Sequence, residues 1–167
     1  MLMQPLTRRA ALSAFGAAAL SPALALAQPG VVFRGVSVDV GPLRANVGDP
    51  TAAWVGAALP GELAQAFGPY LNPRDRSGAL VTVRVDWIYL GPSSGGTGPA
   101  GSSQDTITGV LFVHGPRGSI AAATPLRAIT SYYPMAVDQP LIVQSNHDRI
   151  VALAQAFAYW APRQLGL

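Results

Sequence analysis

The sequence predicts an α+β fold, a two-layer sandwich in which two helices pack on one face of a mostly antiparallel, four-stranded sheet. Two kinds of pattern predict it. Stretches that alternate apolar and polar residues indicate half-buried strands, and two stretches with an apolar residue every three or four positions indicate amphipathic helices. These stretches follow one another in the order β-α-β-β-β-α, which suits two packed layers around one core.

The first strand and the start of the first helix lie close together in the sequence. Residues 35–40, with sequence GVSVDV, alternate apolar and polar side chains. Asp49 and Pro50 then favour a helix start, because Asp is a common N-cap and Pro suits the first helical position. Gly41 and Pro42 are expected to end the strand before this helix begins.

The first helix is predicted to end before Gly68, which is followed by a proline. An apolar residue recurs at every fourth position and marks its buried face: Val55, Leu59, Leu63 and Phe67. We expect a kink or a break at Pro60, because proline lacks the amide hydrogen that a helix interior uses.

Three strands are expected in the middle of the chain, over residues 80–90, 106–114 and 119–124. Their antiparallel pairing would form a meander. Pro125 permits only an edge strand or a strand end at its position, and the third strand can resume after it. Strict alternation in the first of these strands predicts one core-facing set: Val81, Val83, Val85, Trp87 and Tyr89.

A second helix is predicted from residue 145 onward. Ser145 and Asp148 have the spacing of a capping box, which would place His147 in the first helical turn. The inward-facing stripe of this helix is expected to hold five residues: Ile150, Leu153, Ala154, Phe157 and Ala161.

Residues 1–27 have the order of a secretory signal peptide, with Arg8 and Arg9 before an Ala- and Leu-rich run and a small-x-small cleavage pattern at Ala25 and Ala27. We therefore expect a signal peptide over 1–27 and a single domain over residues 28–167. The stretch Thr-Arg-Arg-Ala-Ala-Leu-Ser resembles a twin-arginine export signal, which implies folding before export to the periplasm. Export by the ordinary route and an uncleaved anchor are the alternatives.

Composition excludes several function classes. Two of the three net positive charges belong to Arg8 and Arg9, so the exported chain lacks the basic face that nucleic-acid binding needs. Cysteine is absent, which removes thiolate metal sites and cysteine nucleophiles. His114 and His147 are the only histidines, too few for a typical zinc site. We expect no metal and no cofactor.

Two catalytic motifs occur in the Gly- and Ser-rich loop that follows the second strand. Residues 91–95 fit G-x-S-x-G, and residues 96–101 fit G-x-G-x-x-G. Both motifs work only where a helix follows directly, to launch a nucleophile or to face a pyrophosphate. A strand is expected next, so neither motif predicts a catalytic residue or a dinucleotide site, and enzymatic activity stays uncertain.

Two groups of residues are candidate binding sites. Tyr132, Tyr133 and Met135 lie in an irregular stretch between prolines, and aromatic and Met side chains are enriched at protein interfaces. They are candidates for contact with a partner.

The other group could line a ligand cleft between a helix and the sheet: Arg84, Asp86 and His114. The simpler alternative is that Asp86, Arg84 and the neighbouring Asp39 form a solvent-facing charge cluster.

The predicted export signal, element order and size resemble those of periplasmic accessory proteins, namely lipopolysaccharide-assembly lipoproteins and auxiliary subunits of lipid-transporting ABC systems. The chain departs from these families in lacking the lipidated cysteine. The resemblance implies a non-catalytic accessory or binding protein of the periplasm, with an envelope protein as its partner and no stable membrane anchor once the signal is cleaved. The alternative is a periplasmic small-ligand-binding protein or an enzyme.

Overall fold

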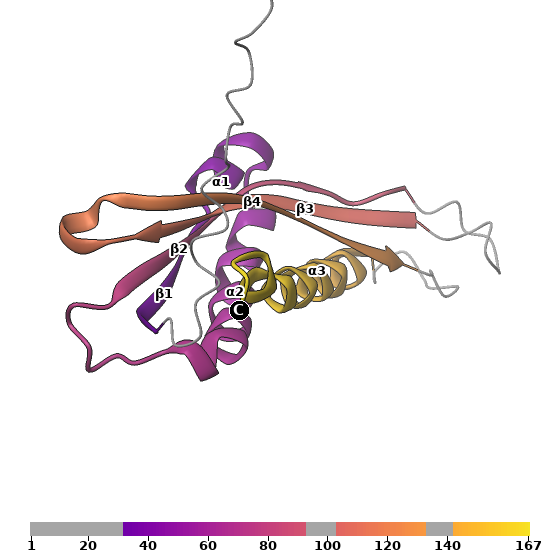
Figure 1. The fold of residues 1–167 in the computed structure, drawn as a ribbon. Coiled ribbons are helices and arrows are strands. Elements are labelled where there is room, and N and C mark those ends of the chain that lie inside the picture. The colour runs from indigo at the N-terminus through magenta and orange to yellow at the C-terminus, as the bar shows by residue number, and fades with distance from the viewer. Residues whose placement is uncertain (1–31, 93–102, 133–141) are drawn as a thin grey trace, which may run out of the picture.

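A computed structural model describes residues 32–92, 103–132 and 142–167. Its elements confirm the α+β class and form two layers, with α2 and α3 on one face of the sheet (Figure 1). In chain order they are β1 (Phe33–Asp39), α1 (Gly41–Val47), α2 (Thr51–Phe67), β2 (Ala79–Tyr89), β3 (Ser103–His114), β4 (Ile120–Tyr132) and α3 (Ile142–Gln164). Single 3₁₀ turns follow α2 and β3.

The four strands form one sheet in the order β1-β2-β3-β4. β1 and β2 are parallel and are joined by the crossover through α1 and α2, whereas the other two pairs are antiparallel. β4 is an edge strand and runs without interruption past Pro125. This confirms the expectation that the proline belongs to an edge strand. The missing amide hydrogen is tolerated there, because no further described strand lies beyond β4 to need it as a hydrogen-bond donor.

The core lies between the sheet and the two long helices. Every residue of the two predicted helix stripes is fully buried there, together with the alternate residues of β2 and β3. Burial of these apolar side chains is the main force that holds each helix to the sheet. α2 continues through Pro60 as one helix, so the break expected at that residue does not occur.

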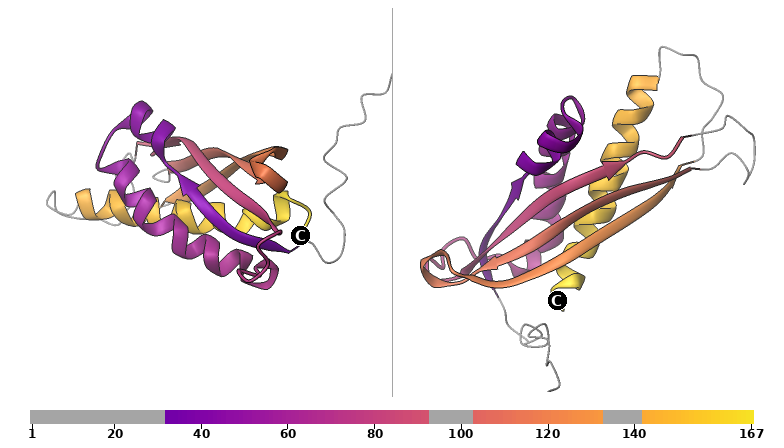
Figure 2. Two further views of the ribbon diagram at one scale, coloured as in Figure 1. Left: turned by 90° about the vertical axis from the view of Figure 1, so that its left-hand side faces the viewer. Right: turned by 90° about the horizontal axis from the view of Figure 1, so that it is seen from above.

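α2 and α3 run parallel to each other. Trp54 of α2 packs edge-on against His147 of α3, with 5.4 Å between the ring centroids. Two turns further along both helices, the Gln155 side chain donates a hydrogen bond to Glu62. The separation along the chain is the same in both pairs, as parallel helices require, and Figure 2 shows the two helices side by side.

Three details of the helices differ from the sequence-based expectation. α1 was not predicted. α2 begins at Thr51, and the Asp49 carboxylate accepts a hydrogen bond from Arg44 at 3.2 Å instead of capping the helix. α3 already begins at Ile142, so Ser145 lies inside the helix and the predicted capping box is wrong.

A β-bulge in β2 overturns the predicted core face of that strand. Val85 pairs with Gly109 and Trp87 with the preceding residue of β3, so Asp86 is the extra residue. One extra residue shifts the alternation of all side chains that follow. Ile88 is therefore buried, whereas Trp87 and Tyr89 point to the opposite face and are exposed.

Two residues accommodate the bulge. The Asn46 side chain of α1 donates a hydrogen bond of 2.9 Å to the carbonyl of Asp86, so a helix that the sequence did not reveal supports the extra residue. On β3, a Cβ atom at Gly109 would lie 2.1 Å from the carbonyl oxygen of Arg84. Only glycine permits this close approach of the two strands.

We predict opposite effects for alanine at two glycines. Gly109→Ala should destabilise the protein by about 1–3 kcal/mol, because the strands must separate to admit the new atom. Gly61→Ala in α2, where an added Cβ meets nothing within 4 Å, should stabilise it by about 0.5–1 kcal/mol. Urea unfolding of both variants measures the two values. A neutral Gly109→Ala variant would contradict the assigned bulge geometry.

Candidate functional site

A group of exposed side chains lies on the face of the sheet opposite α2 and α3, and the bulge places two of them, Trp87 and Tyr89, on that face. Trp87, Tyr89 and Ile129 are 46%, 51% and 49% exposed, and together with Arg127 they form what we call the aromatic patch. In the right-hand view of Figure 2 the sheet lies in front of α3, and no described helix covers this face.

Cross-strand pairing holds the aromatic patch together. Thr108 of β3 lies between Trp87 of β2 and Arg127 of β4, and Thr106 lies in the same way between Tyr89 and Ile129. Directly opposed residues on neighbouring strands share a face and are within contact distance. The patch is therefore a continuous surface across three strands.

The residues predicted to line a ligand cleft lie on this same open face, rather than between a helix and the sheet. Arg84 donates a hydrogen bond of 2.7 Å to the Asp86 carboxylate, and its guanidinium carbon lies 5.1 Å from the centroid of the Phe112 ring. The Phe112 ring in turn neighbours that of His114, with 6.3 Å between centroids. The structure thus links the three predicted residues in one row through Phe112, and ligand binding by them stays a prediction.

Charge pairing occupies the Arg84 guanidinium. The hydrogen bond that Arg84 donates to the Asp86 carboxylate is the main cause that raises the pKa of Arg84 above its ordinary value, and the negative charges of Asp86 and Asp39 add to it. Asp39 lies directly opposite Arg84 on β1. This arrangement matches the solvent-facing charge cluster that was the alternative reading of these residues.

The remaining predicted sites lie mostly outside the described residues. Tyr132 ends β4, opposite Ser103, whereas Tyr133 and Met135 lie beyond the described part of the chain. The same holds for the export residues Arg8, Arg9, Ala25 and Ala27. Among the described residues, no three His, Cys, Asp or Glu side chains are grouped so that they could hold a metal ion.

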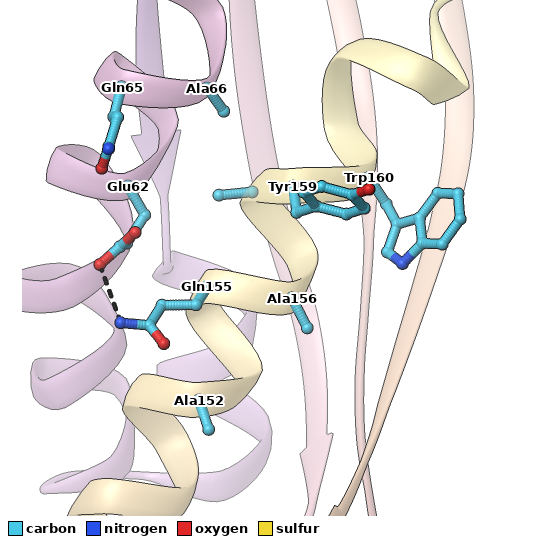
Figure 3. Close-up of a pocket in the computed structure, with 9 residues that line it drawn as sticks. Glu62, Gln65, Ala66, Ala152, Gln155, Ala156, Tyr159 and Trp160 are labelled. Atoms are coloured by element: carbon cyan, nitrogen blue, oxygen red, sulfur yellow. Dashed lines mark hydrogen bonds between the residues drawn. The ribbon is translucent and has the colours of Figure 1, made fainter.

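A second candidate site, which we call the helix groove, lies on the outer side of α2 and α3 and has a volume of about 620 Å³. Figure 3 shows Glu62 and Gln155 facing each other across it, with Tyr159 and Trp160 further along α3. Its lining consists of Glu62, Gln65, Ala66, Ala152, Gln155, Ala156, Ala158, Tyr159 and Trp160.

Aromatic rings and one acidic group define the chemistry of the helix groove. Tyr159 and Trp160 are half-exposed and pack edge to face, with centroids 5.4 Å apart. Glu62 is the only charged residue of the lining, and it accepts a hydrogen bond of 3.3 Å from the Gln155 amide. Arg163 lies outside this lining, with its guanidinium carbon 3.8 Å from the Tyr159 ring centroid.

A buried ion pair, which the sequence analysis missed, joins α3 to the sheet. The Arg149 guanidinium makes two hydrogen bonds to the Asp105 carboxylate, and both side chains are buried. It also donates to the carbonyl of Gly91 at 2.7 Å and to the Ser103 hydroxyl at 3.3 Å. The Gly91 amide completes the network by donating to Asp105 at 3.0 Å.

A signal for this pair was present in the sequence. Asp105 has the same alternation phase as Ile107 and Leu111, which predicts a buried position, and Arg149 directly precedes the apolar stripe of α3. Charged residues at such positions are almost never buried unless they are paired. Because Asp105 and Arg149 are oppositely charged and both stand at positions predicted to be buried, the sequence could have suggested that they pair.

No protein-family model and no curated protein match this chain. Among solved structures it is similar to a candidate lipoprotein from Caulobacter crescentus CB15, with 10% identity, a TM-score of 0.51, and coverage of 78% of this chain and 87% of that one. At this identity the likeness concerns the fold alone. None of the described helices combines the length and the apolar character that a membrane span requires.

Two other solved structures are similar at lower scores. The minor lipoprotein of Acinetobacter baumannii has 16% identity, a TM-score of 0.45, and coverage of 81% of this chain and 92% of that one. The rare lipoprotein B of Shewanella oneidensis has 9% identity, a TM-score of 0.42, and coverage of 78% and 92%.

Removal of one partner of the buried ion pair should strongly destabilise the protein. We expect Arg149→Met to cost about 3–5 kcal/mol, because it leaves the Asp105 carboxylate buried and unpaired. Arg44→Met, at the exposed pair with Asp49, should cost at most about 1 kcal/mol. Urea unfolding of both variants provides the comparison.

The double variant Arg149→Met with Asp105→Leu separates lost pairing from lost packing. It should recover most of the lost stability, because no unpaired charge remains. Equal unfolding free energies for this double variant and for Arg149→Met alone would show that the carboxylate is not the source of the cost.

Proposed function

We propose that this protein is an exported accessory protein of the bacterial envelope that binds a protein partner through its open sheet face. The observation that carries the proposal is the aromatic patch, where Trp87, Tyr89 and Ile129 lie about half-exposed on one face. Contiguous exposed apolar surface marks interaction sites, and Trp, Tyr and Arg are enriched at interfaces. Arg127 supplies the cation at its margin.

The signal-like residues 1–27 support export, and the fold supports an envelope role because the similar Caulobacter protein is described as a lipoprotein. The predicted partner contact also adjoins the patch in the chain. β4 carries Ile129 and then ends at Tyr132, the first residue of that contact. We propose that Tyr132, Tyr133 and Met135, which the sequence indicates as a partner contact, take part in the same interaction.

In cells, a photo-crosslinking amino acid at Tyr89 should capture one discrete protein partner at natural expression level. The matched control is the same replacement at Tyr159, which is a comparably exposed tyrosine on the opposite layer. The proposal predicts a crosslinked band from position 89 and none from position 159. No band from position 89, or the same band from both positions, would reject the open sheet face as the interface.

Export is tested by the mass of the protein recovered from the periplasm, which should begin at Gln28. The double variant Arg8→Lys, Arg9→Lys should abolish periplasmic recovery, because the twin-arginine receptor reads the arginine pair itself. Unchanged export of this variant would assign the chain to the ordinary route. A full-length mass found only in the membrane fraction would contradict cleavage.

A further inference from the structure

The helix groove has the volume of a small-molecule site, and it lies on the opposite layer from the proposed partner surface. We propose that it binds an amphiphilic amine, a small molecule with an apolar body and one cationic nitrogen. The site is independent of the partner surface, since it is formed by α2 and α3 and shares no residue with the aromatic patch.

The size and the lining of the groove suit an apolar body. Its volume of about 620 Å³ lies within the range of small-ligand pockets, which are lined mostly by apolar and aromatic side chains with few polar groups. Ala152 and Ala156 are one helical turn apart and leave the space between the longer side chains free, while Tyr159 and Trp160 provide ring surfaces at one end. The apolar body would lie along these four residues.

The charge of the groove selects a cation. Glu62 is its only charged lining residue, and no ion pair joins Glu62 to a basic side chain within the described residues. The Gln155 amide is a neutral donor, so it leaves the negative charge uncompensated. A carboxylate has acceptor sites for several hydrogen bonds, and a protonated amine would supply further donors together with the opposite charge.

Arg163 sets the orientation of the ligand. It stacks on the Tyr159 ring and donates to the Tyr159 carbonyl at 2.7 Å, so a second cation at that end would meet a like charge. The ligand nitrogen is therefore directed to Glu62. An anionic ligand at Arg163 would in turn face the C-terminal ends of α2 and α3, where the helix dipoles disfavour negative charge.

The assignment is tested with three probes that share an eight-carbon chain: octylammonium, octanol and octanoate, each at pH 7 and below its aggregation concentration. Isothermal titration of the folded, exported chain should show octylammonium bound about two- to fivefold more tightly than octanol, as one partly exposed ion pair allows. Octanoate should bind most weakly. Raising the salt concentration should reduce the advantage of the cation, because exposed charges are screened.

Two substitutions serve as test and matched control. Glu62→Gln should abolish the preference for octylammonium while octanol binding persists. Asp148→Asn removes the same charge from an exposed position of α3 outside the groove and should leave the preference intact. Ala156→Trp fills the floor of the groove and should weaken binding of all three probes, with circular dichroism to verify that each variant is folded.

Equal affinities for octylammonium and octanol, or an unchanged preference in Glu62→Gln, would overturn the cation assignment. If octanoate bound most tightly, Arg163 rather than Glu62 would be the recognising group, and the cation assignment would also be overturned. Failure of all three probes to bind would reject the groove as a small-molecule site, and a protein crosslink from position 159 would show that a polypeptide occupies it. Partner capture at Tyr89 is unaffected by the probe results, so the two proposals fail separately.

Discussion

The position of α3 depends on the buried ion pair between Arg149 and Asp105. The pair joins the helix to the start of β3, and its hydrogen bond to Gly91 adds the segment that follows β2. Both side chains are buried, so any movement of the helix away from the sheet would separate two charges that are largely shielded from water. This constraint sets where α3 begins to cross the sheet, whereas the apolar stripe of α3 sets which face it buries.

The β-bulge has the corresponding role for the sheet. If Asp86 were paired regularly with a residue of β3, Trp87 and Tyr89 would have the same alternation phase as Val85, and their side chains would enter the core. The bulge instead assigns both rings to the open face and Ile88 to the core. Bulges commonly re-aim side chains at functional positions, and here the close approach at Gly109 shows that the opposite strand accommodates the change.

The two layers therefore present two surfaces of different chemistry. The open sheet face carries exposed aromatic and aliphatic side chains, which suits a protein partner. The helix layer carries a concave groove with a single acidic group, which suits a small ligand. They lie on opposite sides of the core, as Figure 1 shows for the layers themselves, so occupation of one leaves the other accessible.

By itself the sequence determined the α+β class, the four strands, both long helices and the buried stripes of those helices, because periodicity is a local property of the chain. Only the tertiary structure decided on which face of the sheet Trp87 and Tyr89 lie. That face depends on the β-bulge, and a bulge exists only in the pairing of one strand with its neighbour. The Arg149–Asp105 pair joins residues 44 positions apart and the Glu62–Gln155 contact residues 93 apart. Pattern can mark Arg149 and Asp105 as buried charges that need a partner, but the contact itself depends on how the helices and strands pack.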